Sequence, residues 1–471
     1  MRMFIAGEWI DRDEKIEVMN PFDGSVVDTV PKADADDVDR ALASAERGAK
    51  IMREMAGYDR FLILRKAADL LEEREEEFGQ VITLEEGKVL AEGIFEASRA
   101  VQTIQLSAEE AKRISGEVVP LDGAPGSGNR FGFTVRVPCG VVACITPFNF
   151  PLNLVAHKIG PALAAGNSVV IKPATDTPLV ALKLTELMLE AGLPDEAIQC
   201  ITGPGSEIGN AIAADSRIRK ITFTGSRDVG EQICQIGGLK KVTMELGSNA
   251  PLIIMPDADL DKVTDAIVST GYANAGQVCI SAQRILPLEP IYNDLLDALT
   301  PKVEAITTGN QMDNSVKMGP MIRETDAVRV ESWVDEAVAQ GARLLTGGER
   351  SGGMYAPTLV ADVKPDMKIS REELFGPAVG VTPVGSADEA IALANDSNYG
   401  LSAGVFTESL DTAMKFVRGI ESGNIMINWG PQWRADLMPY GGLKESGFGK
   451  EGPKYAVQEM TELKMVVFHV D

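Results

Sequence analysis

Three polar residues in widely separated segments are the candidates for chemistry in this sequence: Cys279, Glu245 and Asn149. Cys279 follows a glycine-containing turn and could be a nucleophile, although a free cysteine is also commonly an inert core residue. Glu245 ends a β-like run against small residues, where partial desolvation would make it a general base; a solvent-exposed carboxylate is the alternative. Two prolines bracket Asn149, whose amide could donate a hydrogen bond to a developing oxyanion.

Two glycine-containing turns could approach a phosphate group. Residues 223–230 follow a predicted strand and open a predicted helix, so the amides near Gly225 and Ser226 could face a pyrophosphate. The spacing of this turn is GxxxxG, and residues 203–209 have the spacing GxGxxxG. Neither is the GxGxxG pattern of dinucleotide-binding turns, so glycine spacing alone is weak evidence for a nucleotide site.

The composition indicates which kinds of binding partner and structural site this protein is expected to lack. The 471 residues include 45 basic and 69 acidic side chains, and the formal net charge of −24 argues against binding to nucleic acid or an anionic membrane. The five cysteines form no CxxC pair and there are only two histidines, so we expect neither a disulfide framework nor a metal site. The N-terminus does not resemble a signal peptide, and no run of 18 apolar residues occurs. These features predict a cytoplasmic protein.

The elements that must position these residues follow from hydrophobic periodicity. A short hairpin is expected at the N-terminus, and helices are expected over 34–55 and 59–87. Apolar strands then alternate with helical stretches such as 179–191, which predicts a parallel, doubly wound α/β sheet. The strands of this sheet are predicted over 141–146, 168–172, 198–202, 220–224 and 241–245.

A second α/β segment is predicted from residue 257 to about residue 435. It contains a helix near 326–340 and short strands near 357–360, 378–384 and 404–406. The tail over 460–469 is a predicted strand with no evident neighbour in the chain. Such a strand often pairs with the sheet of another subunit.

Seven motifs, met in order along the chain, resemble those of the aldehyde dehydrogenase superfamily. The resemblance covers essentially the whole chain. It implies an α/β fold with a Rossmann-like cofactor domain (1–113 and 137–246), an α/β catalytic domain (247–443) and a small β oligomerisation element (114–136 and 444–471). The motifs are PFNFP (147–151), IKPA (171–174), FTGS (223–226), MELGSNAP (244–251), GQVC (276–279), EELFGP (372–377) and PYGGLKESGFGKE (439–451).

The resemblance implies a role for each of the three candidates. Cys279 would attack an aldehyde carbon to form a thiohemiacetal, whose oxyanion the Asn149 amide and the Cys279 backbone N–H would hold. Loss of a hydride to NAD or NADP would leave a thioester, and Glu245 would activate the water that hydrolyses it. Relatives that release acyl-CoA lack this base, so Glu245 favours hydrolysis. A CoA-acylating semialdehyde dehydrogenase and a catalytically silent structural or binding protein on this scaffold are the alternatives.

Further residues match the family's cofactor site. Lys172 corresponds to the lysine that bonds the adenosine ribose, and Glu373 to the glutamate that bonds the nicotinamide ribose. Ser226 would reach the pyrophosphate, and Phe375 would pack beside the nicotinamide. The complete predicted cofactor set is Thr146, Pro147, Phe148, Lys172, Thr175, Gly225, Ser226, Glu373 and Phe375.

Two positions depart from the family pattern. Ser248 replaces the second glycine of the common ELGG, a small-for-small change that should be tolerated. Thr175 stands where NAD-selective members usually carry a glutamate. A carboxylate there would bind both ribose hydroxyls and repel a 2′-phosphate, whereas a threonine can donate a hydrogen bond. The sequence therefore admits NADP as well as NAD.

The aldehyde must be inferred from the predicted substrate tunnel. By spacing from Asn149 and Tyr440, the resemblance places His157 and Arg434 in this tunnel, and Arg99 on a helix that lines it. Each residue alone would be an ordinary surface or ion-paired side chain. Together they predict a small polar aldehyde that is anionic or hydroxylated. Phe150 and Tyr440 complete the predicted substrate set.

The run over 436–440 resembles one branch of the family in particular. This branch holds lactaldehyde, phosphonoacetaldehyde and non-phosphorylating glyceraldehyde-3-phosphate dehydrogenases. Val278 stands where some phosphonate-acting members carry arginine, which weighs against that substrate. The family usually forms dimers or dimers of dimers. We therefore expect a homodimer or homotetramer, built on a hairpin near 130–137 and the tail strand over 460–470.

Overall fold

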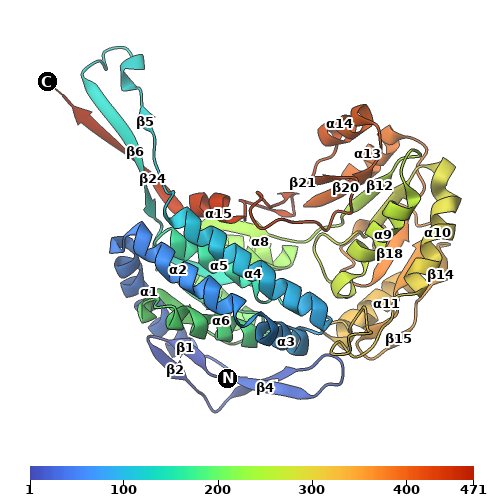
Figure 1. Cartoon of the computed structure of the whole chain (residues 1–471), viewed down its shortest axis with the longest axis horizontal. Coiled ribbons are helices and arrows are strands. Elements are labelled where there is room, and N and C mark those ends of the chain that lie inside the picture. Colours follow the sequence, from blue (N-terminus) through green and yellow to red (C-terminus); the bar gives the residue numbers. More distant parts are fainter. Residues whose placement is uncertain (471) are drawn as a thin grey trace.

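The chain folds into two α/β lobes and a narrow sheet that projects away from the first lobe (Figure 1). The computed structural model describes residues 1–470. The first lobe is built on an eight-stranded sheet and the second on a seven-stranded sheet. Both α/β segments predicted from the sequence are confirmed.

Five parallel strands form the centre of the first sheet, and the strands predicted in this region are confirmed. Their residues are nearly all buried, because separate clusters of apolar side chains cover the two faces of the sheet. In spatial order the strands are β9 (Ile198–Cys200), β8 (Ser168–Lys172), β7 (Val141–Ile145), β10 (Ile218–Thr224) and β11 (Lys241–Glu245). A hairpin of β1 (Met3–Ile5) and β2 (Glu8–Ile10) extends the β9 edge, and β23 (Gly447–Phe448) pairs antiparallel with β11.

Helices pack on both faces of this sheet. One face carries α2 (Gly57–Glu72), α4 (Leu90–Ala111), α5 (Asn153–Ala164) and α6 (Leu179–Glu190). The other carries α1 (Ala35–Glu54), α7 (Asn210–Ala214) and α8 (Arg227–Gly237). Within residues 1–470, no helix is both long enough and apolar enough to cross a membrane.

Two helix predictions need correction. The single helix expected over 59–87 is two helices, α2 and α3 (Glu75–Glu86), because the backbone leaves the helical region at Arg74 (φ −119°, ψ 17°). No glycine or proline marks this break in the sequence. Helix α4 was not given bounds from the sequence, yet it packs against α2, α3 and α5 and reaches the site described below.

The second lobe has a largely parallel sheet. Its order is β14 (Arg343–Thr346), β17 (Thr358–Ala361), β18 (Ala378–Val381), β13 (Arg284–Pro287), β12 (Pro251–Ile254), β20 (Ser402–Phe406) and β21 (Asn424–Ile427). Only β14 runs antiparallel to its neighbour. The helices are α9 (Leu260–Gly271), α10 (Tyr292–Glu304), α11 (Glu324–Ala339), α12 (Lys368–Arg371), α13 (Ala387–Asn395) and α14 (Leu410–Gly419).

The projecting sheet corrects the prediction of a lone tail strand. Strand β24 (Thr461–His469) pairs antiparallel with β6 (Arg130–Pro138) of the same chain, and β5 (Val118–Val119) lies on the other side of β6. The pairing was not evident because 323 to 339 positions separate the partners. β24 is still an edge strand of this sheet.

The predicted domain boundaries also differ from the topology. The boundary at 136/137 falls inside β6. The range 444–471 contains β23, which pairs with the first sheet, and α15 (Pro453–Glu459), which packs on α5 and α4; Asp471 lies outside the described residues. Short elements complete the fold: β3 (Lys15–Met19), β4 (Val26–Pro31), β15 (Arg350–Ser351), β16 (Met354–Tyr355), β19 (Tyr399–Gly400) and β22 (Leu443–Lys444).

Candidate active site

A cavity of about 1070 Å³ is lined by residues of both lobes. It lies at the carboxyl ends of the first lobe's parallel strands, because the last residues of β7, β8, β10 and β11 all line it. This crevice is where open parallel sheets commonly bind their ligands. Every predicted site residue lines the cavity except His157.

Cys279 lies in the loop between a short turn (Ala273–Gly276) and β13. Its thiol sulfur is 3.4 Å from the hydroxyl oxygen of Tyr440. Burial raises the pKa of Cys279 to about 12, so the resting group is a thiol rather than a thiolate. The hydroxyl of Tyr440, whose pKa burial also raises, can donate a hydrogen bond to the sulfur as the thiol loses its proton.

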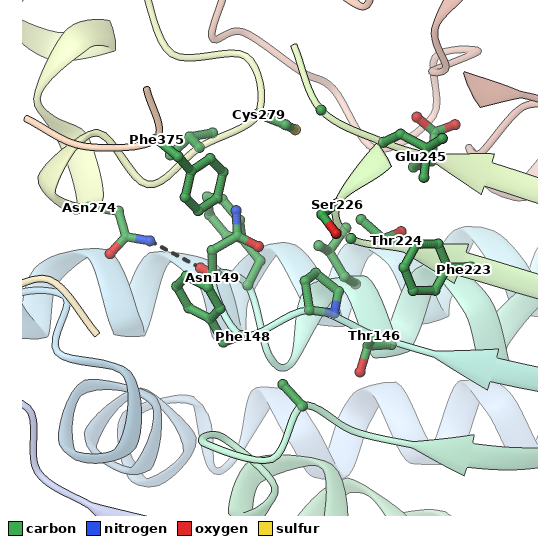
Figure 2. A pocket seen from close by; sticks show the side chains of 18 of the residues that line it. Thr146, Phe148, Asn149, Phe223, Thr224, Ser226, Glu245, Asn274, Cys279 and Phe375 are labelled. Carbon is green, nitrogen blue, oxygen red and sulfur yellow. Dashed lines mark hydrogen bonds between the residues drawn. The ribbon is translucent and has the colours of Figure 1, made fainter. Parts of the chain in front are cut away.

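Glu245 is the last residue of β11 and points into the same cavity (Figure 2). Its side chain is buried, and neither carboxylate oxygen has a hydrogen-bond partner within residues 1–470. Burial, followed by the negative charge of Glu451, raises its pKa well above the ordinary value for a glutamate. The predicted desolvation is confirmed, and the alternative of a solvent-exposed carboxylate is wrong.

Asn149 follows β7 in the loop that precedes α5, and it lies below the Cys279 loop in Figure 2. Its side-chain Nδ2 donates to the backbone carbonyl oxygen of Gln277 at 2.8 Å. Gln277 is two residues before Cys279. The amide of the first lobe is therefore held directly against the segment that carries the thiol.

A buried ion-pair cluster beside Glu245 was not predicted. Lys158 Nζ is 3.0 Å from Glu451 Oε1, and Arg434 Nη1 is 3.1 Å from Glu451 Oε2. Burial alone would raise the pKa of Glu451, but Lys158 and Arg434 lower it. A signal was present in the sequence: Lys158 is the one lysine, arginine, aspartate or glutamate in the largely apolar stretch that forms α5.

The far end of the cavity contains the residues that were predicted to bind the adenosine ribose and the pyrophosphate of the cofactor. Lys172 ends β8, and burial lowers its pKa to about 8. The Thr175 hydroxyl donates to the carbonyl oxygen of Gly203 at 3.3 Å. Ser226 precedes α8, and in the described part of the chain its side chain makes no capping hydrogen bond to that helix, so the N–H groups of the first turn can face an anion.

The predicted nicotinamide end is arranged around Glu373. Its Oε1 accepts a hydrogen bond from the Ser248 backbone N–H at 2.8 Å, and burial raises its pKa to about 7. A Cβ at residue 247 would lie 2.6 Å from Glu373 Oε2, so this approach requires the glycine of the ELGS motif. Phe375 and Phe148 meet edge to face with ring centroids 5.9 Å apart.

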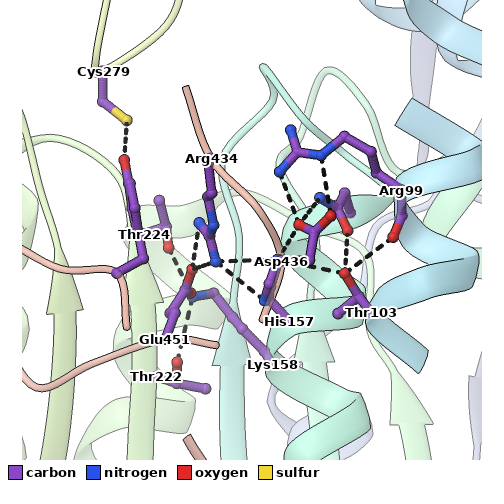
Figure 3. Close-up of polar contacts among 12 residues, drawn as sticks. Arg99, Thr103, His157, Lys158, Thr222, Thr224, Cys279, Arg434, Asp436 and Glu451 are labelled. Carbon is purple, nitrogen blue, oxygen red and sulfur yellow. Dashed lines mark hydrogen bonds and ion pairs between the residues drawn. The ribbon is translucent and has the colours of Figure 1, made fainter. Parts of the chain in front are cut away.

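The predicted substrate residues do not form a set of free cations (Figure 3). Arg99 makes two hydrogen bonds to Asp436, at 2.8 and 3.2 Å, and His157 Nε2 is 2.9 Å from the same carboxylate. His157 is buried behind Arg434 and does not line the cavity, which corrects its predicted place on the tunnel wall. Burial and the charge of Arg434 lower its pKa to about 4, so it is neutral. Asp436 was not among the predicted residues.

Buried polar atoms without a partner mark this cavity as a binding site. Within residues 1–470, such atoms occur in five residues that line it: Thr146, Glu245, Asn274, Gln432 and Arg434. Most buried polar groups in proteins are hydrogen-bonded, so the exceptions call for a ligand or a chemical role. The uncapped first turn of α8, Lys172 and Glu373 form a donor and acceptor set that fits a dinucleotide.

Comparison with known proteins agrees with this arrangement. The sequence profile of the aldehyde dehydrogenase family matches residues 9–466. The chain is 50% identical to a 3-sulfolactaldehyde dehydrogenase of Priestia megaterium over 468 residues, which covers 99% of this chain and 98% of the relative. It is 36% identical to a lactaldehyde dehydrogenase of Methanococcus aeolicus, covering 99% of each chain. Among solved structures, the NADP-dependent glyceraldehyde-3-phosphate dehydrogenase of Bacillus halodurans C-125, complexed with NADP, superposes with a TM-score of 0.97 at 36% identity, covering 100% of this chain and 99% of that one.

Proposed function

This chain belongs to the aldehyde dehydrogenase family, whose members oxidise aldehydes with NAD or NADP, and we propose that it converts a small anionic or hydroxylated aldehyde to its carboxylate through Cys279. The observation that carries this proposal is the meeting of three groups in one cavity. They are the Cys279 thiol, the Asn149 amide and the buried, unpartnered carboxyl of Glu245. Relatives of similar sequence act on sulfolactaldehyde and lactaldehyde.

In the first half of the reaction, Cys279 Sγ attacks the carbonyl carbon of the aldehyde. The thiol proton passes through water to solvent, and a C–S bond forms. The oxyanion of the thiohemiacetal accepts hydrogen bonds from the Asn149 side chain and the Cys279 backbone N–H. Bound NAD(P)⁺ supplies the acceptor for the hydride that leaves the thiohemiacetal carbon, which becomes a thioester.

In the second half, Glu245 takes a proton from a water molecule as that water attacks the thioester carbonyl. The C–S bond breaks, and the Cys279 sulfur leaves and takes up the proton that Glu245 accepted from the water. The carboxylic acid is released and ionises to solvent. The raised pKa of Glu245 suits this role, because it makes the carboxylate a stronger base than an ordinary glutamate. The positive charges of Arg434 and Lys158 act in the opposite direction and partly offset the rise in the pKa of Glu245.

The role of Glu245 is tested by rapid mixing of Glu245→Gln with aldehyde and cofactor. We expect the first turnover to produce NAD(P)H in a burst, because thioester formation does not consume water. Steady-state turnover should fall by about 10²- to 10⁴-fold. A variant that turns over at the wild-type rate would overturn the hydrolytic mechanism, and so would wild-type rates in Cys279→Ala.

The same experiment separates hydrolysis from transfer to coenzyme A. A CoA-acylating enzyme would keep its turnover in Glu245→Gln as long as coenzyme A is present, because the thiol of CoA replaces water as the attacking group. We expect no rescue by coenzyme A and a free carboxylate as the product. Acyl-CoA in the product mixture of the wild-type protein would favour the acylating alternative.

The charges at the substrate end support an anionic aldehyde. Three cations, Arg99, Lys158 and Arg434, face two carboxylates, Asp436 and Glu451. Burial alone would raise the pKa of both carboxyls, but the cations around them and the hydrogen bond from His157 lower it. While Glu245 is protonated, this cluster carries an excess of one positive charge. Among the described residues 1–470, Arg434 Nε also has no partner, so it can donate to an anionic group on the substrate.

A matched pair of substrates tests this part of the proposal. 3-Sulfolactaldehyde and lactaldehyde differ only in the sulfonate, so the ratio of their kcat/KM values measures the response of the site to the anion. We expect a ratio well above one, with glyceraldehyde 3-phosphate, succinate semialdehyde and phosphonoacetaldehyde as further anions. A ratio at or below one would leave the aldehyde dehydrogenase activity standing and remove the anionic specificity.

We also propose that the enzyme uses NADP as well as NAD and assembles as a homodimer or homotetramer. The neutral Thr175 supports the use of NADP, since no carboxylate at that position repels a 2′-phosphate.

The exposed edge strand β24 supports the assembly into a homodimer or homotetramer. It carries the half-exposed apolar side chains Leu463, Met465 and Phe468. Cofactor titrations and light scattering of the purified protein test these two points separately.

A further inference from the structure

A buried lysine beneath the site has no role in the reaction described above. Lys88 lies in the short connection between α3 and α4, and its side chain is only 1% exposed. Its Nζ donates to Glu96 Oε2 at 2.8 Å and to the backbone carbonyl oxygen of Asn149 at 2.6 Å. Burial alone would lower the pKa of Lys88, but the charges of Glu96 and Glu86 raise it, so the group remains an ammonium. A buried charge of this kind is costly unless its partners are well placed.

The partners of Lys88 fix the loop that carries Asn149. Glu96, which Lys88 contacts, also accepts the backbone N–H groups of Leu152 and Asn153 at 2.8 and 3.0 Å. The Lys88–Glu96 pair therefore holds the loop at Asn149 itself and again three residues later. The ammonium also lies 4.1 Å from the ring centroid of Phe150, the next residue in the loop.

A second donor reaches the same carbonyl from the other lobe. Asn274 Nδ2 donates to the Asn149 carbonyl oxygen at 3.2 Å, as the dashed line in Figure 2 shows, and to Glu86 Oε1 at 2.8 Å. The Asn274 backbone N–H is 3.2 Å from the carboxylate oxygens of Glu92. Asn274 adopts a left-handed conformation (φ +50°), which is strained for a residue other than glycine. The acidic residues around Lys88 thus hold both the Asn149 loop and the start of the Cys279 loop.

We propose that Lys88 and Asn274 are positioning residues, which fix the backbone of Asn149 so that its side-chain amide meets the oxyanion formed at Cys279. Both donors act on the carbonyl oxygen of Asn149, while the side-chain Nδ2 on the other side of the residue faces the Cys279 segment. An oxyanion donor is effective only when it is held within a fraction of an ångström of its working place. Neither residue needs to touch the substrate.

The inference rests on the proposed role of Asn149, and a double-mutant cycle tests the two separately. The variants are Lys88→Met, Asn149→Ala and the combination, and the measured quantity is the rate of the first NAD(P)H burst. We expect Lys88→Met to slow the burst by about 10- to 100-fold. In the Asn149→Ala background the same change should cost less than about threefold, because no amide is left to position. Cofactor affinity and the KM for the aldehyde should stay within about twofold of wild type in Lys88→Met, because Lys88, although it lines the cavity, directs its ammonium to Glu96 and the Asn149 carbonyl.

A matched control separates positioning from a general loss of structure. Lys220 is also a fully buried lysine, on β10, and its Nζ donates to Thr243 at 2.6 Å, away from the cavity lining. Lys220→Met should leave the burst rate within about twofold of wild type. Asn274→Gly provides a second test if Lys88→Met does not fold, because glycine accepts the left-handed backbone without strain. We expect a slowing of about three- to tenfold from the loss of one donor.

The outcomes are distinct. If Asn149→Ala leaves the burst rate unchanged, the proposed oxyanion role of Asn149 is wrong, and the positioning role falls with it. If Asn149→Ala slows the burst and Lys88→Met or Asn274→Gly does not, only the positioning role is wrong. If the effects of Lys88→Met and Asn149→Ala multiply in full, Lys88 acts independently of the amide, and the inference is again overturned.

Discussion

At the cofactor end of the cavity the contact groups stand at the ends of neighbouring strands of one sheet, whereas at the substrate end they come from segments as much as 337 positions apart. Lys172 ends β8, Thr146 follows β7 and Ser226 follows β10, so the register of these neighbouring strands sets their spacing. Arg99 and Asp436 meet only because α4 and the loop before Tyr440 pack together. The first arrangement depends on the backbone, and the second on charge pairing.

This difference teaches where specificity can change without loss of the fold. A group at a strand end can be exchanged while the strand remains, because the sheet's hydrogen bonds do not depend on that side chain. Exchange of one group in a buried ion-pair cluster also changes the charge balance of its partners, since removal of one partner leaves the other charged and desolvated. We therefore expect simple changes of specificity at the cofactor end and coupled ones at the substrate end.

Of the changes that test this comparison, Arg434→Met at the substrate end should have the largest effect. Loss of this cation should lower kcat/KM for 3-sulfolactaldehyde by about 10- to 100-fold, the range for a lost charge-assisted hydrogen bond. The value for lactaldehyde, which has no anionic group, should change by only a few-fold. Steady-state kinetics on the two substrates check this. An equal loss of kcat/KM on both substrates would show that Arg434 acts through Glu451 and the proposed base Glu245 rather than by binding the anionic group of the substrate.

Thr175→Glu should break the cofactor end without disturbing the substrate end. The new carboxylate would repel a 2′-phosphate and could accept hydrogen bonds from ribose hydroxyls, so the Kd for NADP should rise by at least about tenfold. The Kd for NAD should stay the same or fall. Quenching of protein fluorescence by each cofactor measures both, and Thr175→Gln serves as the neutral control. Parallel changes for NAD and NADP would show that residue 175 does not face the 2′ position.

The pH dependence of cofactor binding sharpens the same comparison. Burial lowers the pKa of Lys172 to about 8, so the free enzyme loses this charge as the pH rises through about 8. Affinity for NADP should therefore weaken by about three- to tenfold between pH 7 and 9, and affinity for NAD, which lacks the 2′-phosphate, should weaken less. Titrations across this range measure the effect. In Lys172→Arg the affinity for NADP should no longer weaken between pH 7 and 9, because a guanidinium stays charged. If the affinity still weakens in this variant, another group causes the pH dependence.

The smallest effect is expected from Asp436→Asn. The amide keeps the size of the side chain but removes one negative charge, so the positive excess at the substrate end increases and Arg99 is no longer neutralised. We expect kcat/KM for 3-sulfolactaldehyde to rise about two- to fivefold, with little change for lactaldehyde. A fall on the anionic substrate would show instead that Asp436 is needed to orient Arg99 for binding.

The residues proposed for cofactor binding and catalysis could be placed in one cavity from the sequence because their signals are local. The strands over 141–145, 168–172 and 241–245 appear as short apolar runs, and Asn149, Lys172 and Glu245 follow or end such runs. The C-terminal ends of parallel strands meet at one edge, so the pattern itself implied a common site. The resemblance to a family then related Cys279, which no local charge marks as reactive, to the other two.

The substrate end could not be predicted in the same way because its partners are not local. Arg99, His157 and Arg434 were predicted as tunnel residues, but the carboxylates that neutralise or orient them were not foreseen. Asp436 lies two residues from Arg434 in the sequence and bonds to Arg99 and His157 on two different helices. Nothing in the spacing of charged residues encodes such a meeting. The pairing of β24 with β6 was missed for the same reason.

The sequence by itself determined the family, the parallel α/β sheets and the three residues that we propose as the nucleophilic thiol, the oxyanion-binding amide and the general base. It did so because strand periodicity and contiguous motifs are properties of short segments. Only the tertiary structure decided the protonation of these groups and the charge of the cavity. The pKa values of Cys279, Glu245 and His157 are set by burial and by neighbours distant in the chain, and the position of the Asn149 amide depends on Lys88 and Asn274. Burial and long-range charge pairing exist only once the lobes have packed against each other.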